Sequence, residues 1–283
     1  MDVIYHVAAR VNHIRSYDAL KPANVDSVSE ILTIASRMKP KVVNFVSTLG
    51  SAVRKDSHGR YVEDFPDETE LNSDMGYLLS KWEGERLMGD FDRAGRHANI
   101  FRLGYISGHS KTGAALCHDN QLMLFIKSCI QMGFAPTLNR LVNLTPIDLT
   151  TQIMNLPQFR EQGGQVINLV SCSEYISWNE LVEWLNVQGQ PIKMISFPEW
   201  QRKLIADGEG NPLYRFLPLY GQPDAYEKIL RFGKEIHNFR TEKMEELDAK
   251  GLIKLPPLKY SLLECYFAYL YTVNFISHPK LAA

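Results

Sequence analysis

The feature that most constrains the fold of this chain is a regular alternation of short β-type runs with longer helical patterns. The β-type runs lie at 2–8, 42–47 and 97–102, and helical patterns fill the stretches at 17–38 and 74–95. The run at 42–47, VVNFVS, is apolar almost throughout, which is typical of a strand buried on both faces of a parallel sheet. This order of strands and helices predicts βαβ units, and therefore an α/β fold with a Rossmann-like, doubly wound parallel sheet.

The second half of the 283-residue chain has a different texture. A strand is expected at 165–170, and S-x-x-E capping boxes at Ser177 and Ser196 each predict the start of a helix. Prolines are frequent between 206 and 260, which predicts a loop-rich helical region. The apolar stretch at 260–276 is interrupted by polar residues, so we expect a core-facing helix there and no membrane association.

The charge and cysteine content exclude several classes of protein. Lys and Arg number 31 and Asp and Glu 32, so the net charge of −1 provides no global attraction to nucleic acid or to anionic membranes. The four cysteines are far apart and form no C-x-x-C motif, so we expect reduced thiols and a cytoplasmic location. His109 and His118 have no carboxylates at ligand spacing, and we expect no metal site. The polar N-terminus does not have the pattern of a signal peptide.

The sharpest motif is Tyr77-Leu-Leu-Ser-Lys81, in the predicted helix at 74–95. Residues four apart share one face of a helix, so the ammonium of Lys81 is expected beside the phenol of Tyr77. A free Tyr has a pKa of about 10, and a neighbouring cation lowers that pKa toward the range of a usable general acid. Taken alone, the spacing is common, and an ordinary amphipathic helix explains it as well.

The context of this motif makes its chemistry more specific. The run at 42–47 leads into Ser47-Thr48 at the carboxyl end of a parallel strand, where α/β sheets bind ligands. A hydroxyl there can donate a hydrogen bond to a carbonyl oxygen and stabilise developing negative charge. A turn or a helix cap explains Ser47-Thr48 alone. The combination of strand, Ser-Thr, spacer and Tyr-x-x-Ser-Lys on a helix is much rarer by chance, and it indicates reduction of a carbonyl group.

With these motifs the chain resembles an extended short-chain dehydrogenase/reductase, and in particular the thioester reductase domains of nonribosomal peptide and polyketide synthetases. The segments that carry the resemblance are HVAARVNH (6–13), FVSTLG (45–50), GYLLSKWEGER (76–86), FRLGYISG (101–108) and LTPIDL (144–149). The segment at 76–86 is close to the GYxxSKWxxE motif of that family, and together with STLG it is fairly specific. The resemblance covers residues 2–205 and is weak over the rest.

The resemblance implies a catalytic set of Thr48, Tyr77 and Lys81, with Ser47 as the alternative to Thr48. Thr48 would orient the carbonyl group and Tyr77 would donate the proton. Lys81 would lower the pKa of Tyr77 and hold the nicotinamide ribose. The resemblance also implies contacts to the cofactor from Ala8, Ala9, Lys81, Leu103, Gly104, Tyr105 and Ile106.

The cofactor of the family is NADPH, and its substrate is an acyl or peptidyl thioester on the phosphopantetheine arm of a carrier protein. Reduction gives an aldehyde, which some members reduce further to an alcohol. On this basis we expect residues 1–140 to form a partial NAD(P)-binding domain. Residues 141–283 are expected to form a smaller, mostly helical substrate-binding region, interleaved with the last strands of the sheet.

The expected cofactor site lacks one familiar part. Dinucleotide-binding folds of this kind begin with a strand, a Gly-rich turn and a helix N-terminus that binds the pyrophosphate. The only G-x-G in the sequence, Gly208–Gly210, follows no predicted strand and is followed by Pro212. We therefore expect a family member truncated at its N-terminal side, in which the strand at 2–8 becomes a sheet edge.

Two other hypotheses remain open. One is a different extended reductase, such as a nucleotide-sugar epimerase or an aldehyde reductase, and the other is a non-catalytic truncated remnant or carrier-docking module. His6 and His13 are expected to be turn or core histidines. Arg54, Lys55 and Arg60 are expected on a solvated face, with the acidic surface of a carrier protein as the alternative partner.

Overall fold

The computed structural model describes residues 2–67, 69, 71–142, 144–170, 175–227, 236–255 and 259–279. The strands are β1 Val3–His6, β2 Val42–Thr48, β3 Ala98–Leu103, β4 Phe134–Pro136, β5 Leu141–Val142, β6 Gln165–Leu169, β7 Ile176–Ser177 and β8 Lys193–Ile195. The helices are α1 Tyr17–Lys21, α2 Ser27–Ala35, α3 Gly76–Arg93, α4 Gln121–Met132, α5 Ile147–Met154, α6 Pro157–Glu161, α7 Trp178–Val187, α8 Phe197–Asp207, α9 Leu217–Tyr220, α11 Glu242–Ala249 and α12 Lys259–Thr272. Short helical turns lie at η1 Pro22–Asp26, η2 Leu49–Ser51, η3 Gly208–Gly210, η4 Tyr214–Phe216 and η5 Ile236–Asn238.

The chain divides into two compact units that are not contiguous in sequence. The first unit contains Met1–Gly104, Asp148–Cys172 and Ile236–Leu255, and the second contains the segments between and after them. The sequence predicted one boundary near residue 140, with the later region interleaved with the last strands of the sheet, whereas residues 105–140 belong to the second unit. The difference arises because α4 and β4 pack in the core of the second unit.

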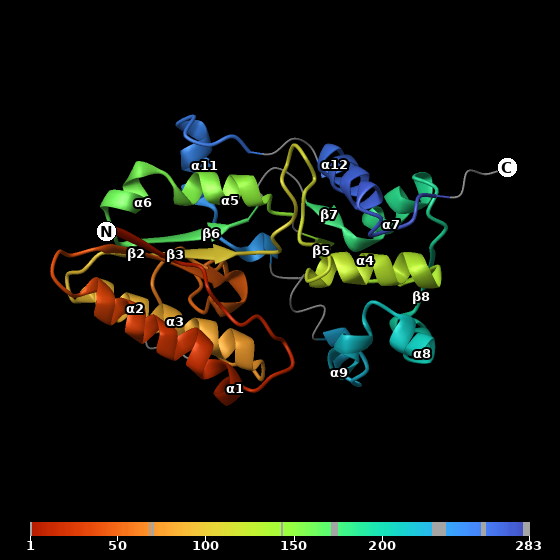
Figure 1. Cartoon of the computed structure of the whole chain (residues 1–283), viewed down its shortest axis with the longest axis horizontal. Helices are drawn as coiled ribbons and strands as arrows, with labels where there is room; N and C mark the ends of the chain where they lie inside the picture. Colours follow the sequence, from red (N-terminus) through yellow and green to blue (C-terminus); the bar gives the residue numbers. More distant parts are fainter. Residues whose placement is uncertain are drawn as a thin grey trace. The chain divides into compact units, whose positions relative to one another are not determined.

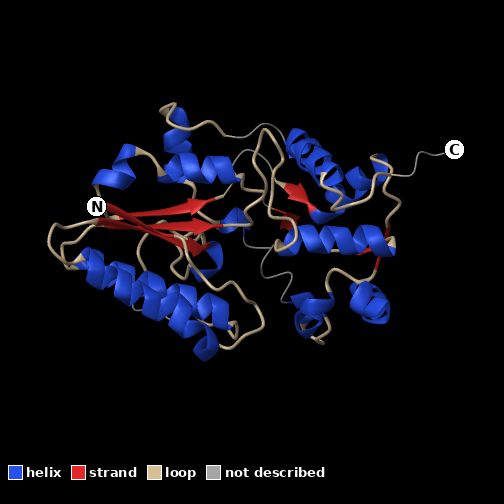
Figure 2. Ribbon diagram, viewed as in Figure 1, coloured by secondary structure: helices blue, strands red, loops and turns tan. Residues whose placement is uncertain are grey.

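The first unit is built on a four-stranded parallel sheet of order β1-β2-β3-β6. Helices α2 and α3 cover one face, and helices α5, α6 and α11 cover the other (Figures 1 and 2). Strand β1 lies at one edge of this sheet, as the sequence predicted. The arrangement confirms the predicted α/β, Rossmann-like fold.

Alternate residues of the strands enter two cores, one on each face of the sheet. Val43, Phe45 and Ile100 pack with α2 and α3, and all three are fully buried. Phe101 and Ile167 point to the other face and pack with α5, α6 and α11. A sheet covered on both faces requires apolar side chains at consecutive positions, which explains the nearly continuous apolar run of β2.

The helical pattern at 17–38 is interrupted in the structure. Helix α1 ends at Lys21, a π-helical turn occupies Pro22–Asp26, and α2 begins at Ser27. Pro22 has no N–H to continue the regular hydrogen-bond ladder, and the wider turn buries Asn24 and Val25. The apolar periodicity alone could not predict this turn, because the pattern continues across it.

The second unit consists of helices around two small sheets, β4 paired in parallel with β8 and β5 paired antiparallel with β7. Phe125 of α4 packs against Trp178 and Trp200, with ring centroids 4.9 and 5.1 Å apart. The predicted capping box at Ser177 is present, and the Ser196 side chain accepts the N–H of Glu199.

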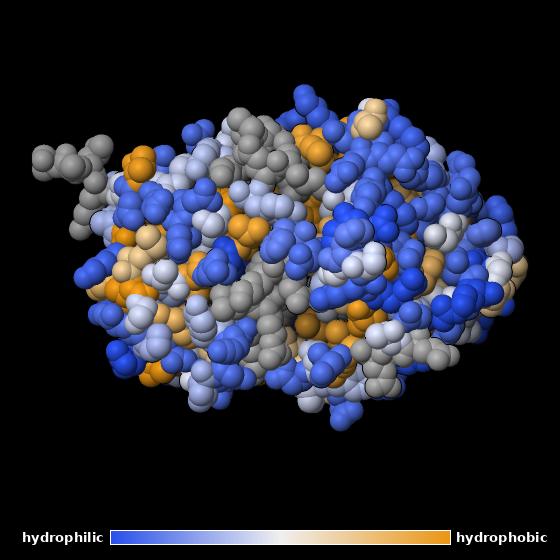
Figure 3. Space-filling view, turned by 180° about the vertical axis from the view of Figure 1, so that it is seen from behind, coloured by the Kyte–Doolittle hydropathy of each residue, from blue (hydrophilic) through white to orange (hydrophobic). Residues whose placement is uncertain are grey.

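Most of the apolar stretch at 260–276 lies in α12, whose Leu263, Tyr266 and Leu270 are buried in the core of the second unit. The prediction of a core-facing helix is confirmed. Among the described helices, none is both long and apolar enough to cross a membrane. On the face drawn in Figure 3, hydrophobic residues are scattered in small groups among hydrophilic ones.

Candidate active site

The carboxyl end of β2 carries two adjacent hydroxyl side chains with different surroundings. Ser47 is 4% exposed, and its Oγ lies 3.1 Å from Oγ of Ser51. Thr48 is half-buried, and its Oγ1 accepts the N–H of Gly50 at 3.4 Å. Among the described residues, no group accepts the proton of the Thr48 hydroxyl. Thr48 is therefore better placed than Ser47 to donate a hydrogen bond to a bound carbonyl oxygen.

Tyr77 lies in the first turn of α3, with its ring buried. The imidazole of His13 contacts this ring edge-on, with 5.2 Å between the centroids, although the sequence indicated only a turn or core histidine. Burial raises the pKa of Tyr77 to about 12. The sequence predicted that Lys81 would lower this pKa. The shift has the opposite direction because the buried phenolate loses its hydration, while the Lys81 ammonium is directed to the carbonyl oxygen of Val46.

Lys81 lies one turn after Tyr77 and is 2% exposed. Its Nζ donates to the carbonyl oxygen of Val46 at 2.7 Å and lies 3.9 Å from the centre of the Phe45 ring. Burial lowers the pKa of Lys81 to about 7, and the Glu85 carboxylate acts in the opposite direction. The ammonium is thus held against the backbone of β2, which joins the helix motif to the strand motif.

Four of the residues expected at the cofactor lie at the same sheet edge as the end of β2. Ala8 and Ala9 follow β1, Leu103 is the last residue of β3, and Gly104 comes directly after it. Because β1, β2 and β3 are parallel neighbours, their carboxyl ends meet at one edge, which is the usual ligand-binding edge of an α/β sheet. Tyr105 and Ile106 belong to the second unit.

Lys81 and the backbone of Ala8 and Ala9 at this edge could hold the ribose and nicotinamide end of a dinucleotide. A lysine ammonium has three donors, and Lys81 uses one of them on Val46. Ala8 is exposed and Ala9 half-buried, so their small side chains leave the backbone accessible to a ligand. The individual contacts to the cofactor remain predictions.

A buried ion pair that the sequence analysis missed lies behind this site. Arg102 of β3 donates to both carboxylate oxygens of Glu85 in α3, at distances from 2.8 to 3.2 Å. Their side chains are 2% and 0% exposed. Oε1 of Glu85 also accepts the hydroxyl of Ser51. The spacing of Glu85 four residues after Lys81 was a usable signal, but nothing in the sequence identified Arg102 as its partner.

Asn24 links the loop after β1 to helix α3. Its side-chain amide accepts the N–H of Arg10 at 2.7 Å, and donates to Oγ of Ser80 at 2.9 Å. Ser80 in turn donates to the carbonyl oxygen of Tyr77 at 2.8 Å. This link depends on the π-helical turn that buries Asn24, so the sequence pattern could not predict it.

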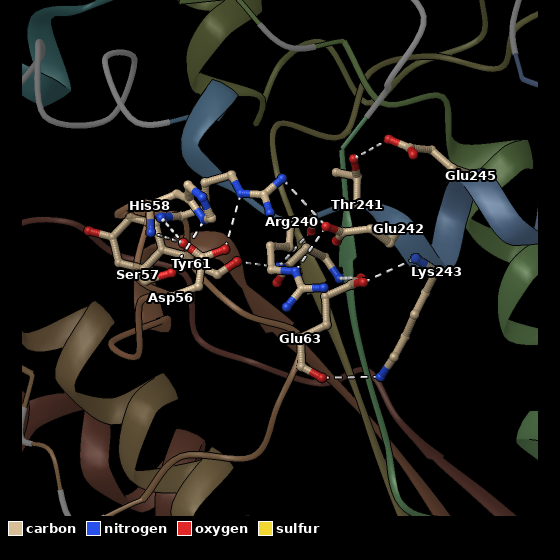
Figure 4. A network of polar contacts seen from close by, with 12 residues as sticks. Asp56, Ser57, His58, Tyr61, Glu63, Arg240, Thr241, Glu242, Lys243 and Glu245 are labelled. Carbon is tan, nitrogen blue, oxygen red and sulfur yellow. Dashed lines mark hydrogen bonds and ion pairs between the residues drawn. The ribbon is translucent and has the colours of Figure 1, made fainter.

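A second polar network lies near the carboxyl end of β6 (Figure 4). The buried Glu63 carboxylate accepts the backbone N–H of Asn168 at 2.9 Å and that of Lys243 at 3.1 Å. Nζ of Lys243 donates to the carbonyl oxygens of Glu63 and Val166. Burial raises the pKa of Glu63 to about 7 in spite of these hydrogen bonds. The network fastens the loop after β2 to the segment at 236–255.

The arginines of this loop have acidic neighbours. Arg54 forms ion pairs with Asp64 and Asp67, at 3.4 and 3.3 Å. Arg60 forms an ion pair with Asp56 at 3.1 Å. These pairs agree with the expected solvated face more than with a docking surface for an acidic protein.

The comparisons with known proteins agree with this geometry. A profile of the male sterility protein family, a family of NAD-binding domains, matches residues 1–154 and so more than half of the chain. The chain belongs to this family. Its membership in this family supports a nicotinamide cofactor.

Two solved structures of reductase domains from peptide and polyketide synthetases are similar to this chain. The terminal R domain from the myxalamid PKS-NRPS biosynthetic pathway is 26% identical, with a TM-score of 0.77, over 99% of this chain and 70% of that chain. A thiolation-reductase di-domain from an archaeal non-ribosomal peptide synthetase shares the fold at 20% identity, with a TM-score of 0.76, over 97% of this chain and 58% of that chain. The expected resemblance to terminal reductase domains is confirmed.

A relative found by sequence comparison is also a reductase. The L-2-aminoadipate reductase large subunit of Eremothecium gossypii is 28% identical over an alignment of 298 positions, which covers 99% of this chain and 21% of that protein. The chain thus spans about a fifth of the length of this relative.

Proposed function

We propose that this NAD-binding domain is an NADPH-dependent reductase that converts a carrier-bound acyl or peptidyl thioester to an aldehyde. The observation that carries the proposal is the placement of three residues. Thr48 offers a free hydroxyl proton at a strand end, while Tyr77 and Lys81 lie on the helix that packs against that strand. The similarity to the myxalamid terminal R domain supports thioester reduction as the reaction.

Thr48 and Tyr77 have separate roles in the proposed reaction. Thr48 donates a hydrogen bond to the thioester carbonyl oxygen and stabilises the negative charge that develops there. Bound NADPH supplies the hydride. The Tyr77 phenol stays protonated at neutral pH, because its pKa is raised to about 12, and it gives its proton to the carbonyl oxygen. The resulting hemithioacetal releases the carrier thiol and leaves an aldehyde, which a second reduction can convert to an alcohol.

Lys81 orients the cofactor in this scheme. One of its donors holds the carbonyl oxygen of Val46, and the other donors are available to the hydroxyls of the nicotinamide ribose. The remaining contacts would come from Ala8, Ala9, Leu103, Gly104, Tyr105 and Ile106.

The partner in this proposal is a carrier protein that presents the thioester on a phosphopantetheine arm. The similarity to a di-domain that joins a thiolation domain to a reductase supports this partner. We place the reaction in the cytoplasm, where the thiols of Cys117, Cys129 and Cys265, which form no disulfide, stay reduced.

The test is turnover of an acyl thioester on a phosphopantetheinylated carrier protein, with nicotinamide absorbance and aldehyde followed together. We expect one NADPH oxidised for each aldehyde formed, and much slower turnover with NADH. Conversion of a nucleotide sugar without thioester turnover would instead favour another extended reductase. NADPH binding without turnover of either substrate would indicate a non-catalytic remnant.

A further inference from the structure

The carboxylate of Glu85 lies between the two parts of the proposed site, which are the strand end with Thr48 and the helix with Tyr77 and Lys81. We propose that Glu85 is a positioning residue, which holds the turn after Thr48 through Ser51 and faces Lys81 from the next turn of α3. The inference rests on the proposed function for its kinetic test. Its structural basis lies entirely within the first unit.

The turn after Thr48 is held by the hydroxyl of Ser51. Ser51 is fully buried, its Oγ lies 2.6 Å from the carbonyl oxygen of Thr48, and it also contacts Oε1 of Glu85. A serine hydroxyl has one proton, and a carboxylate is a stronger acceptor than a peptide carbonyl. Glu85 therefore takes the proton of Ser51, and Oγ of Ser51 is left to accept the hydroxyl of Ser47 at 3.1 Å, so the carboxylate holds the residue before Thr48 and the last residue of the turn after it.

Glu85 is itself fixed in orientation by Arg102. The guanidinium binds both carboxylate oxygens, and two of its other donors bind the carbonyl oxygens of Val62 and Asp64 at 3.0 and 3.1 Å. A buried carboxylate held by a planar guanidinium has little freedom to rotate. Through Glu85 and Arg102, the turn after Thr48 is thus hydrogen-bonded to α3, to β3 and to the loop that contains Val62 and Asp64.

Glu85 also faces the second half of the site. It lies four residues after Lys81 on the same helical face, and its charge raises the pKa of Lys81 against the effect of burial. The other titratable groups at this point are Tyr77 on the same helix and His6 of β1, whose pKa is lowered by burial and by Lys81. Arg102 lies behind Glu85 on β3. Glu85 is thus the acidic group that favours the charged form of Lys81.

The direct test is Ser51→Ala, which removes the link and leaves the Glu85–Arg102 pair in place. We expect kcat for thioester reduction to fall about tenfold and KM to change by less than about twofold, because a displaced Thr48 hydroxyl matters most in the transition state. Ser128→Ala is the matched control, since Ser128 is equally buried and donates to Asn211 of the second unit at 2.8 Å. A loss of kcat no larger than that of the control would overturn the proposal.

A second measurement does not depend on turnover. We expect an NMR titration of the Lys81 side chain to give a lower pKa in Glu85→Gln than in the wild type. Glu85→Gln leaves Arg102 without its counter-charge, so Glu85→Gln/Arg102→Met is measured beside it in case the single variant unfolds. An unchanged Lys81 pKa in the folded variants would overturn the inference even if the wild type reduces thioesters. A lowered pKa in a protein that reduces no thioester would support the inference and reject the proposed function.

Discussion

Tyr77 combines a buried ring with a hydroxyl that makes no hydrogen bond to any described residue. Its pKa of about 12 keeps the phenol protonated well above neutral pH. A proton donor in a reduction needs this protonation state before the hydride arrives, and it gives up the proton only as the carbonyl oxygen becomes strongly basic. The raised pKa therefore suits the donor role better than a lowered one would.

Tyr77→Phe tests this role, because it removes the hydroxyl and keeps the ring against His13. We expect kcat for thioester reduction to fall by a factor on the order of 10²–10⁴, with the denaturation midpoint nearly unchanged. Steady-state kinetics and chemical denaturation give the two quantities. A variant that keeps more than about a tenth of the wild-type kcat would rule out Tyr77 as the proton donor.

Lys81→Met tests the proposed contact to the cofactor, because it removes the ammonium and roughly preserves the length of the side chain. A hydrogen bond from a charged donor contributes about 1.5–3 kcal/mol, so we expect the dissociation constant of NADPH to rise about tenfold or more. Fluorescence titration of the bound nicotinamide measures it. Wild-type affinity in a folded variant would show that Lys81 does not hold the ribose.

Glu63 gives the stability of the first unit a pH dependence of known sign. Its pKa is about 7 in the folded chain and ordinarily 4.5, so the folded state binds more protons within that window. Its contribution to stability is therefore complete below the window and is lost as the pH rises through it. Glu63→Gln imitates the protonated acid. We expect the free energy of unfolding of the wild type, relative to this variant, to fall by on the order of 2 kcal/mol between about pH 5 and pH 8. Denaturant titrations at both pH values measure this difference, and a constant difference would contradict the assignment.

At the scale of elements, the site depends on the close approach of α3 to β2. A Cβ at Gly84 would lie 2.9 Å from Cζ of Phe45 and 3.4 Å from the carbonyl oxygen of Asn24. Phe45 is fully buried in the core under α2 and α3, where side chains are close-packed and a shift of the ring costs free energy. Gly84 therefore allows the helix to lie close enough for Lys81 to reach the carbonyl oxygen of Val46.

Gly84→Ala is expected to lower the free energy of unfolding by about 1–3 kcal/mol and to reduce kcat, because the added methyl pushes α3 away from the strand. Gly89→Ala on the same helix is the control. A Cβ there would lie 3.2 Å from Nη1 of the flexible Arg93 side chain and 3.5 Å from Phe65, which is an ordinary contact distance, so the higher helix propensity of alanine should leave stability unchanged or raise it by up to about 1 kcal/mol. Denaturant titrations of both variants measure the two free energies of unfolding. Equal values would contradict the proposed close contact between α3 and β2.

The strands and helices that carry the site could be predicted from the sequence, because burial on both faces of β2 and the amphipathic face of α3 leave direct patterns. The sequence could not predict which of Ser47 and Thr48 has its hydroxyl available to a substrate carbonyl, since this depends on the position of Ser51 in the following turn. The direction of the Tyr77 pKa shift was also beyond the sequence. It depends on how much water the surrounding residues exclude, and four-residue spacing says nothing of that.

At the scale of the whole chain, the parallel pairing of β3 with β6 brings a late segment back to the first unit. The predicted boundary near residue 140 differs from the two units because the chain enters the second unit at Tyr105, and α4 and β4 pack in its core. The segment at 236–255 also belongs to the first unit, where Lys243 joins the Glu63 network. A loop-rich stretch with many prolines gave no sequence signal for this contact.

The central claim is that a thioester carbonyl carbon receives a hydride at the site of Thr48, Tyr77 and Lys81. The most direct test is reaction of an acyl thioester on its carrier protein with NADPH deuterated at both C4 positions, followed by mass spectrometry of the aldehyde. We predict one deuterium on the aldehyde carbon for the wild type, and label incorporation at least about a hundredfold slower in Thr48→Val and Tyr77→Phe. Aldehyde without deuterium, or label incorporated at the wild-type rate by both variants, would contradict this account.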